Sequence, residues 1–173
     1  MIRITDKYAF FYTEWPSNFK DTSFTWKAFG ESHHFFCTEQ AFMWAKAKYF
    51  GDEETAKEIL KLKSEGNNPM WCKQCGRWVK GYDDEKWSLA RYSFMLEVNM
   101  CKYTQDKKLQ AKLLDPQFDG KFFVEASPTD FIWGCGLAQQ DPKIIDEKNW
   151  TGKNLLGQVI TNVRKTIIHD KEC

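Results

Sequence analysis

The sequence lacks the patterns that identify several large classes of protein. No stretch approaches the roughly 18 consecutive apolar residues of a membrane-spanning helix, and no apolar signal core follows Met1. No internal repeat, linker or low-complexity tract marks a boundary between domains. From these absences we expect a cytoplasmic protein that has no contact with a membrane and consists of one domain over residues 1–173.

Histidine is scarce, and the usual spacings of zinc ligands are missing. Neither a second Cys-x-x-Cys nor a closely spaced histidine pair accompanies Cys72 and Cys75. The preceding Asn68-Pro69 indicates a helix start, whereas a thioredoxin-type site would follow a strand. We therefore predict that the protein uses no metal and no cofactor, and that its six cysteines are reduced thiols.

An excess of charge of one sign is also missing, because 25 Lys and Arg side chains oppose 24 Asp and Glu, for a net charge of +1. The protein as a whole has no strong attraction to polyanions, so a nucleic-acid substrate would have to be held by a local patch. Aromatic side chains are abundant, with eight Trp and fourteen Phe among 42% hydrophobic residues. This composition predicts a well-packed globular protein.

The spacing of apolar residues predicts mostly helices. Aromatic and β-branched residues between Tyr8 and Cys37 predict short strands, and 122–124 predicts one buried strand. Helical spacing and capping residues predict helices that begin near Thr38, Asp52, Asn68, Asp83, Asp106 and Asn154. Many helices with few short strands indicate an α+β fold that is predominantly helical.

The segment after the predicted strand at 122–124 carries a candidate site. Glu125 and Asp130 stand five residues apart around a proline turn, and Trp133 and Gly134 follow. Carboxylates supply charge, an indole supplies a flat face, and glycine lets the backbone come close to a ligand. An ordinary turn with surface acids and a core tryptophan has the same composition.

A second candidate lies on the predicted helix over residues 38–50. Glu39, Met43 and Lys46 fall on one face of a helix that is otherwise apolar nearly all round, and Gly51 ends it. We expect the two charges to face a cavity or each other. The alternative is an exposed Glu and Lys that bracket a core helix.

These segments and three others occur in the order typical of the NADAR (YbiA-like) family, which the chain resembles. They are WPSNF at 15–19, TEQAFMWAK at 38–46, CGR at 75–77, EASPTDFIWG at 125–134 and GKNLLG at 152–157, with Arg164 beyond them. The resemblance implies a YbiA-like fold and N-glycosidase chemistry, the hydrolysis of a bond between ribose C1 and nitrogen. Family members remove ADP-ribose from guanine bases or act on phosphoribosylamino intermediates of riboflavin synthesis. Gln40 replaces a histidine common in the family, so no role is assigned to that position.

Further residues are candidates for substrate binding. Lys153 and the backbone N–H groups at the helix start near Asn154 form a candidate binding site for a phosphate or pyrophosphate group. The others are Asn18 for ribose or base, Trp87 for stacking on a base, the guanidinium groups of Arg77 and Arg164 for binding phosphate, and Lys102. Each is also consistent with capping, core packing or a structural ion pair.

Cleavage of a C1–N bond places positive charge on the ribose and negative charge on the base, so two acids can divide the work. We expect Glu39 to act as acid or base and Asp130 as an ionised stabiliser. Alternatively, Lys46 attacks C1 and forms a Schiff base. The preferred substrate is a base linked to ADP-ribose, including ADP-ribosylated DNA or RNA. The alternatives are a riboflavin intermediate, or a non-catalytic module that binds ADP-ribose or a nucleotide.

Overall fold

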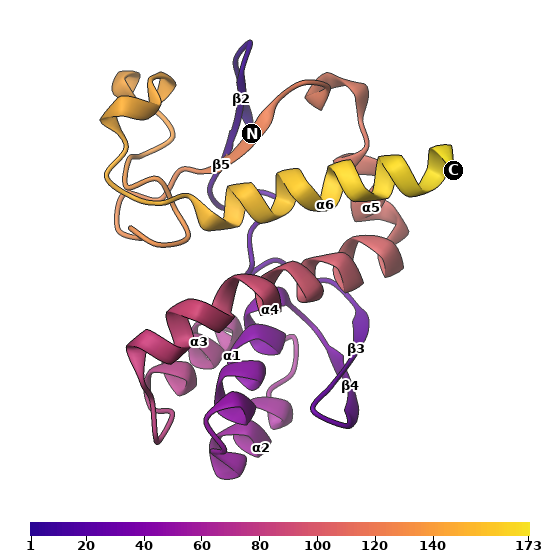
Figure 1. Cartoon of the computed structure of the whole chain (residues 1–173), viewed down its shortest axis with the longest axis vertical. Helices are drawn as coiled ribbons and strands as arrows, with labels where there is room; N and C mark the ends of the chain where they lie inside the picture. Colours follow the sequence, from indigo (N-terminus) through magenta and orange to yellow (C-terminus); the bar gives the residue numbers. More distant parts are fainter. The chain divides into compact units, whose positions relative to one another are not determined.

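The computed structural model describes residues 1–173, which fold into two compact units (Figure 1). The first unit comprises residues 1–17 and 107–173, and the second comprises residues 18–106. Six α-helices, five short strands and three 3₁₀ turns confirm the predicted α+β, predominantly helical fold. None of the helices is both long enough and apolar enough to cross a membrane.

The first unit is built on a three-stranded sheet. Its strands are β1 (Arg3–Ile4), β2 (Tyr8–Phe11) and β5 (Phe122–Glu125), in the order β1-β2-β5. β1 runs antiparallel to β2, whereas β5 runs parallel to it. The fully buried β2 fits a central strand that is covered on both faces. Helix α6 (Leu155–Glu172) packs along β5, as Figure 1 shows.

Shorter elements complete the first unit. They are α5 (Lys107–Leu113) and the 3₁₀ turns η1 (Pro116–Phe118), η2 (Pro142–Ile145) and η3 (Glu147–Asn149). The segment between β5 and α6 otherwise has no regular structure, and it carries the candidate turn at 125–134. Turns that hold charged side chains in place are common positions for functional residues.

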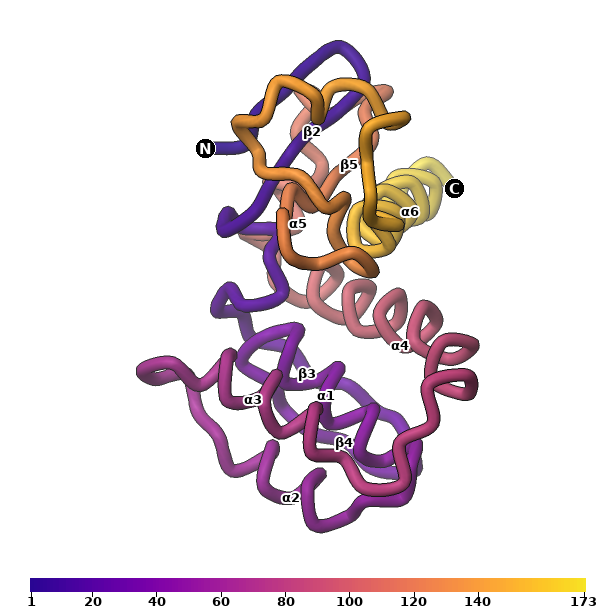
Figure 2. Tube along the Cα trace, turned by 90° about the vertical axis from the view of Figure 1, so that its left-hand side faces the viewer, coloured from indigo at the N-terminus to yellow at the C-terminus, as the bar shows by residue number.

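The second unit packs four helices with one hairpin. The hairpin is β3 (Phe24–Ala28) with β4 (Glu31–Phe35), and the helices are α1 (Thr38–Tyr49), α2 (Glu53–Lys61), α3 (Asn68–Arg77) and α4 (Asp84–Gln105). Helix α1 contacts the other three helices and β4, and Figure 2 shows α2 and α3 beside it. Nine of its twelve residues are buried, which agrees with the prediction of a helix that is apolar nearly all round.

Local capping residues set most helix ends as predicted. Asp52 and Asp83 accept hydrogen bonds from the backbone N–H groups of Thr55 and Lys86, and these bonds cap α2 and α4. Gly51 follows α1 with a positive φ of 73°, which suits glycine. The predicted cap of α1 was wrong by one residue, because the Sγ of Cys37, not Thr38, accepts from Gln40 N–H at 3.4 Å.

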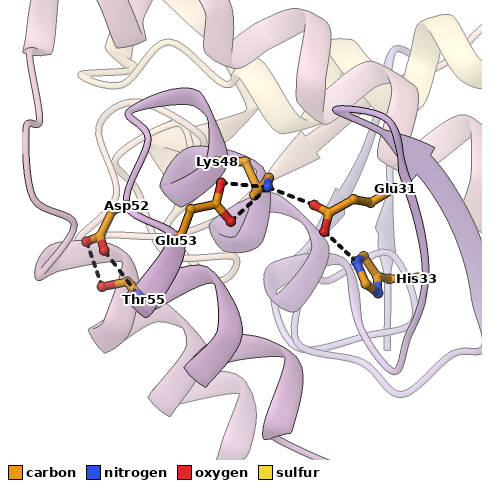
Figure 3. A network of polar contacts seen from close by, with 6 residues as sticks. All are labelled: Glu31, His33, Lys48, Asp52, Glu53 and Thr55. Carbon is orange, nitrogen blue, oxygen red and sulfur yellow. Dashed lines mark hydrogen bonds and ion pairs between the residues drawn. The ribbon is translucent and has the colours of Figure 1, made fainter.

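A partly exposed ionic network joins three elements of the second unit (Figure 3). Lys48 of α1 donates to Glu53 of α2 at 2.7 Å and pairs with Glu31 of β4 at 2.7 Å. His33 lies 3.7 Å from Glu31 in the same group. Pairs of this kind in contact with solvent contribute about 0–1 kcal/mol each, so apolar burial around α1 provides most of the stability.

Candidate active site

Glu39 and Lys46 lie on α1 and interact electrostatically. Glu39 is buried, with 7% of its surface exposed, and its backbone N–H donates to the carbonyl oxygen of Asn18 at 3.0 Å. Lys46 is half-buried, and its Nζ lies 4.4 Å from the centre of the Tyr82 ring. Burial lowers the pKa of Lys46, the charge of Glu39 opposes that shift, and the charge of Arg77 adds to it. A lower pKa enlarges the fraction of neutral, nucleophilic amine at a given pH.

Two predicted binding residues lie in the same unit as this pair. Asn18 is 8% exposed, and its buried Oδ1 makes no hydrogen bond within the chain. Arg77 is exposed at the end of α3, where its charge acts on Lys46. Gly76 permits this arrangement, since a Cβ there would collide with the Sδ of Met43 on α1. Close packing of α3 on α1 thus places a cation beside the Glu39–Lys46 pair.

Trp87 and Lys102 of α4 lie in the interior of the second unit. Trp87 is 5% exposed and packs against the rings of Phe42, Tyr49 and Phe94. Lys102 has no exposed surface, and burial lowers its pKa to about 8. Their burial favours packing roles over the substrate contacts that were predicted for them.

In the first unit, Asp130 organises the candidate turn. Its Oδ1 accepts from the backbone N–H groups of Ile132 at 3.0 Å and Trp133 at 2.8 Å. Its own N–H donates to Ser127 Oγ at 3.2 Å, and its Oδ2 makes no hydrogen bond within the chain. One carboxylate oxygen therefore holds the turn while the other is available to a ligand.

Gly134 is required by the packing of the same turn. A Cβ at this position would lie 2.8 Å from both the Asp130 carbonyl oxygen and the Ser127 Cβ, which is too close for any side chain. Glu125 is partly buried at the end of β5, and its carbonyl oxygen accepts from Cys135 N–H at 2.9 Å. The tight turn brings the partly buried indole of Trp133 into the same segment as both carboxylates.

The prediction that backbone N–H groups at the start of α6 are free to bind a phosphate is wrong. The N–H groups of residues 153–156 donate at 2.9–3.1 Å to carbonyl oxygens of residues 131–134 (Figure 2 shows this loop beside α6). The side chain of Asn154 is engaged as well, accepting from Glu125 N–H at 2.9 Å and donating to the Phe123 carbonyl at 3.1 Å. These groups hold the turn onto α6 and β5, so they are not available to a phosphate.

Lys153, by contrast, keeps an exposed side chain at the rim of a pocket of about 240 Å³ in the first unit. The pocket is lined by Lys7, Tyr8, Phe122, Phe123, Glu147, Trp150, Lys153, Asn154, Gln158 and Thr161. Its polar groups largely bond to one another, as when Tyr8 donates to Glu147 at 3.0 Å and Phe123 N–H donates to Thr161 at 2.9 Å.

The contacts of Arg164 and Cys72 are with other residues of the protein. Arg164 donates to the Leu113 carbonyl at 2.9 Å and pairs with Asp119 at 2.5 Å, so its alternative interpretation as a structural ion pair holds. Cys72 is fully buried, and a hydrogen bond with Cys37 together with burial raises its thiol pKa. No group of three or more His, Cys, Asp or Glu side chains is arranged to hold a metal ion.

Sequence reasoning missed Arg91 and Tyr82 as candidates. Arg91 is 7% exposed on α4, four residues after Trp87 and four before the buried Met95. A charged residue on a buried helix stripe is unusual unless it is paired, and that signal was present in the sequence. Tyr82 precedes α4, and its ring contacts Lys46.

The structure thus groups the predicted residues within each unit. Glu39, Lys46, Asn18 and Arg77 belong to the second unit, and the residues of the turn at 125–134 belong to the first. The prediction that Glu39 and Asp130 serve one site stays a prediction.

Substitution of Asp130 by asparagine separates its two roles. Asparagine keeps an Oδ1 that can accept from Ile132 and Trp133 N–H, so the melting temperature is expected to stay within about 2 °C of the unchanged protein. If the charge stabilises a cationic ribose, turnover falls on the order of 100-fold. Asp130→Ala, which loses both roles, should also melt earlier. Unchanged turnover in a folded Asp130→Asn protein would remove Asp130 from the mechanism.

Comparison with known proteins agrees with the motif order. The family model described as "NADAR domain" matches residues 3–168. The chain is 34% identical over 174 residues to N-glycosidase R617 of Acanthamoeba polyphaga mimivirus, covering 93% of this chain and 96% of that protein. It is 38% identical over 135 residues to Protein irg-1 of Caenorhabditis elegans, covering 77% of this chain but only 61% of irg-1.

A solved structure shares the fold. The NMR structure of the Escherichia coli protein YbiA matches with a TM-score of 0.71 at 24% sequence identity, covering 98% of this chain and 90% of YbiA. At this identity the match shows the fold alone.

Proposed function

Because the chain belongs to the NADAR domain family, we propose that it removes ADP-ribose from guanine bases by hydrolysing the bond between ribose C1 and the base nitrogen. The coarser class, a hydrolase of N-glycosyl bonds, agrees with the name of N-glycosidase R617, which matches over 93% of this chain. The proposal concerns the substrate, which we take to be guanine linked to ADP-ribose.

One observation carries the proposal of catalysis rather than binding alone. A buried carboxylate, Glu39, and a half-buried amine with a lowered pKa, Lys46, act on each other from a helix in which nine of twelve residues are buried. Burying ionisable groups is costly, and perturbed groups of this kind concentrate at catalytic sites. A module that only binds a nucleotide has no need of such a pair.

Two routes use the pair differently. In the acid–base route, water adds to ribose C1, the electron pair of the C1–N bond passes to the base, and Glu39 as the carboxylic acid protonates the departing nitrogen. The Glu39 carboxylate then takes up the proton that the attacking water loses, which restores the acid. In the covalent route, the neutral amine of Lys46 attacks C1 as the base leaves, the sugar ring opens to a Schiff base, and water then releases the ribose. In both routes Asp130 is proposed to stabilise the positive charge on the sugar.

The basic and aromatic groups around Lys46 support a phosphorylated substrate. Arg77 lies close enough to influence the Lys46 charge, and Tyr82, whose ring lies beside Lys46, is 45% exposed. A pyrophosphate would bring negative charge to this cluster, and an adenine can stack on an exposed aromatic ring. These features suit ADP-ribose better than a sugar without an adenosine half.

Competition between product analogues tests the choice of substrate. With ADP-ribosylated guanosine DNA as substrate and released ADP-ribose as the readout, free ADP-ribose is expected to inhibit at concentrations about tenfold or more below ribose 5-phosphate, because the adenosine half adds contacts. Phosphoribosylaminopyrimidines are assayed in parallel. Equal potency of the two inhibitors, with turnover only of the pyrimidine, would identify the riboflavin intermediates as the substrate. Tight binding of ADP-ribose without turnover of either substrate would identify a binding module.

A further inference from the structure

Arg91 of α4 is a buried cation without a partner. Only 7% of its surface is exposed, and its buried Nε makes no hydrogen bond. No carboxylate forms an ion pair with it, in contrast to Arg164, which is 8% exposed but bonds to the Leu113 carbonyl and to Asp119. The chain thus contains two buried arginines, one paired and one unpaired.

An unpaired guanidinium is expensive to bury. It holds its proton at any ordinary pH, so it cannot become neutral as a buried lysine or carboxyl group does. Because a buried charge without a partner costs free energy, folding alone does not explain the arginine. A group of this kind persists where function needs it.

The surroundings of Arg91 are basic and aromatic. The charge of Arg91 acts on Tyr82, whose ring lies 4.4 Å from the Nζ of Lys46, and Lys46 in turn is repelled by Arg77. The neighbouring acid Asp84 accepts a hydrogen bond from the Tyr82 hydroxyl at 2.7 Å. Two cations, Lys46 and Arg91, therefore act on the Tyr82 side chain, and Arg77 acts on Lys46, while no carboxylate forms an ion pair with Arg91.

We infer that Arg91 binds phosphate oxygens of the substrate, and that with Tyr82, Lys46 and Arg77 it forms an anion-binding subsite in the second unit. The planar guanidinium fork matches two oxygens of a phosphate or pyrophosphate and gains most where water is excluded. The inference rests on the proposed function for the identity of the substrate, but the subsite can be tested with a bare anion.

The test compares Arg91→Met with Arg164→Met as a matched control in the full chain. Binding of sodium pyrophosphate, of ADP-ribose and of uncharged adenosine is measured by calorimetry, and thermal unfolding is recorded for each variant. Arg91→Met is expected to lose on the order of 30-fold or more in affinity for pyrophosphate and ADP-ribose, with adenosine unaffected. Arg91→Lys keeps the charge but loses the planar guanidinium group. Its affinity for pyrophosphate and ADP-ribose should therefore lie between that of Arg91→Met and that of the unchanged protein.

Stability separates binding from a structural role. Arg91→Met is expected to melt at or above the temperature of the unchanged protein, because it removes an unpaired buried charge. Arg164→Met is expected to melt roughly 5 °C lower with unchanged affinity, because it leaves the Leu113 carbonyl unsatisfied. The inference is overturned if Arg91→Met binds pyrophosphate like the unchanged protein.

A measurement on the unchanged protein covers the case in which Arg91→Met does not fold. With arginine side chains labelled with nitrogen-15, the Nε–H resonance of Arg91, assigned from its loss in Arg91→Lys, should shift saturably as pyrophosphate is added. No shift under saturating anion would overturn the subsite. A clear shift in a protein that releases no ADP-ribose would keep the subsite and reject the proposed reaction.

Discussion

Replacement of Glu39 by glutamine is expected to lower turnover at least about 100-fold while the protein stays folded. Glutamine has nearly the same shape, and the hydrogen bond from residue 39 to the Asn18 carbonyl comes from the backbone, so it survives the change. What is lost is the proton that a carboxyl group delivers to the leaving base. Single-turnover release of base from the ADP-ribosylated substrate measures the effect.

Glu53→Gln is the matched control, because Glu53 is an exposed carboxylate of the same unit that pairs only with Lys48. It should leave turnover unchanged. Near-normal turnover by a folded Glu39→Gln protein would discard Glu39 as the catalytic group. Borohydride reduction during turnover then separates the two routes, since a Schiff base on Lys46 would be trapped as a stable adduct in the unchanged protein but not in Lys46→Met.

Gly157→Ala is expected to destabilise the first unit by about 3 kcal/mol, although Gly→Ala inside a helix normally stabilises by up to about 1 kcal/mol. The sign reverses because a Cβ on residue 157 would collide with the Phe123 carbonyl oxygen and with both terminal atoms of the Asn154 side chain. Those atoms form the hydrogen bonds that hold β5 to the start of α6. We expect the melting temperature to fall by roughly 6–12 °C.

Activity should fall with stability in Gly157→Ala, because the turn that carries Asp130 is bonded to the first residues of α6. Lys165→Ala, at an exposed position of the same helix, serves as the control and should change the melting temperature by no more than about 2 °C. A Gly157→Ala protein as stable as this control would show that α6 and β5 can separate without cost, and that Asn154 does not clamp them.

Local features of the chain made most of the helices predictable. Asp52 and Asp83 cap their helices through bonds to backbone N–H groups three residues ahead, and Gly51 ends α1 because its own backbone can adopt a positive φ. Each of these interactions lies within a few residues, so the sequence pattern contains both partners. The apolar character of α1, which led to Glu39 and Lys46 as candidates, is local in the same sense.

The prediction of a phosphate-binding site at the start of α6 failed because the contacts that decide it are not local. A helix start with glycine and lysine before it is a good anion site only while its N–H groups lack partners. In this protein the carbonyl oxygens of residues 131–134, about twenty positions earlier in the chain, accept those bonds. No spacing rule relates the two segments, because the irregular chain between them decides whether they meet.

By itself, the sequence determined the family through the order of its motifs and the predominantly helical α+β fold, and it indicated Glu39 and Lys46 of one helix as candidates. Only the tertiary structure decided which polar groups already have partners. In the folded protein, the first amides of α6 and the side chain of Asn154 are hydrogen-bonded, and Lys102 is buried. Arg164 pairs with Asp119, whereas Arg91 is buried without a partner. Helix and strand patterns arise from neighbours in the chain, whereas the satisfaction of a charge or hydrogen bond depends on atoms that only folding brings within about 3 Å.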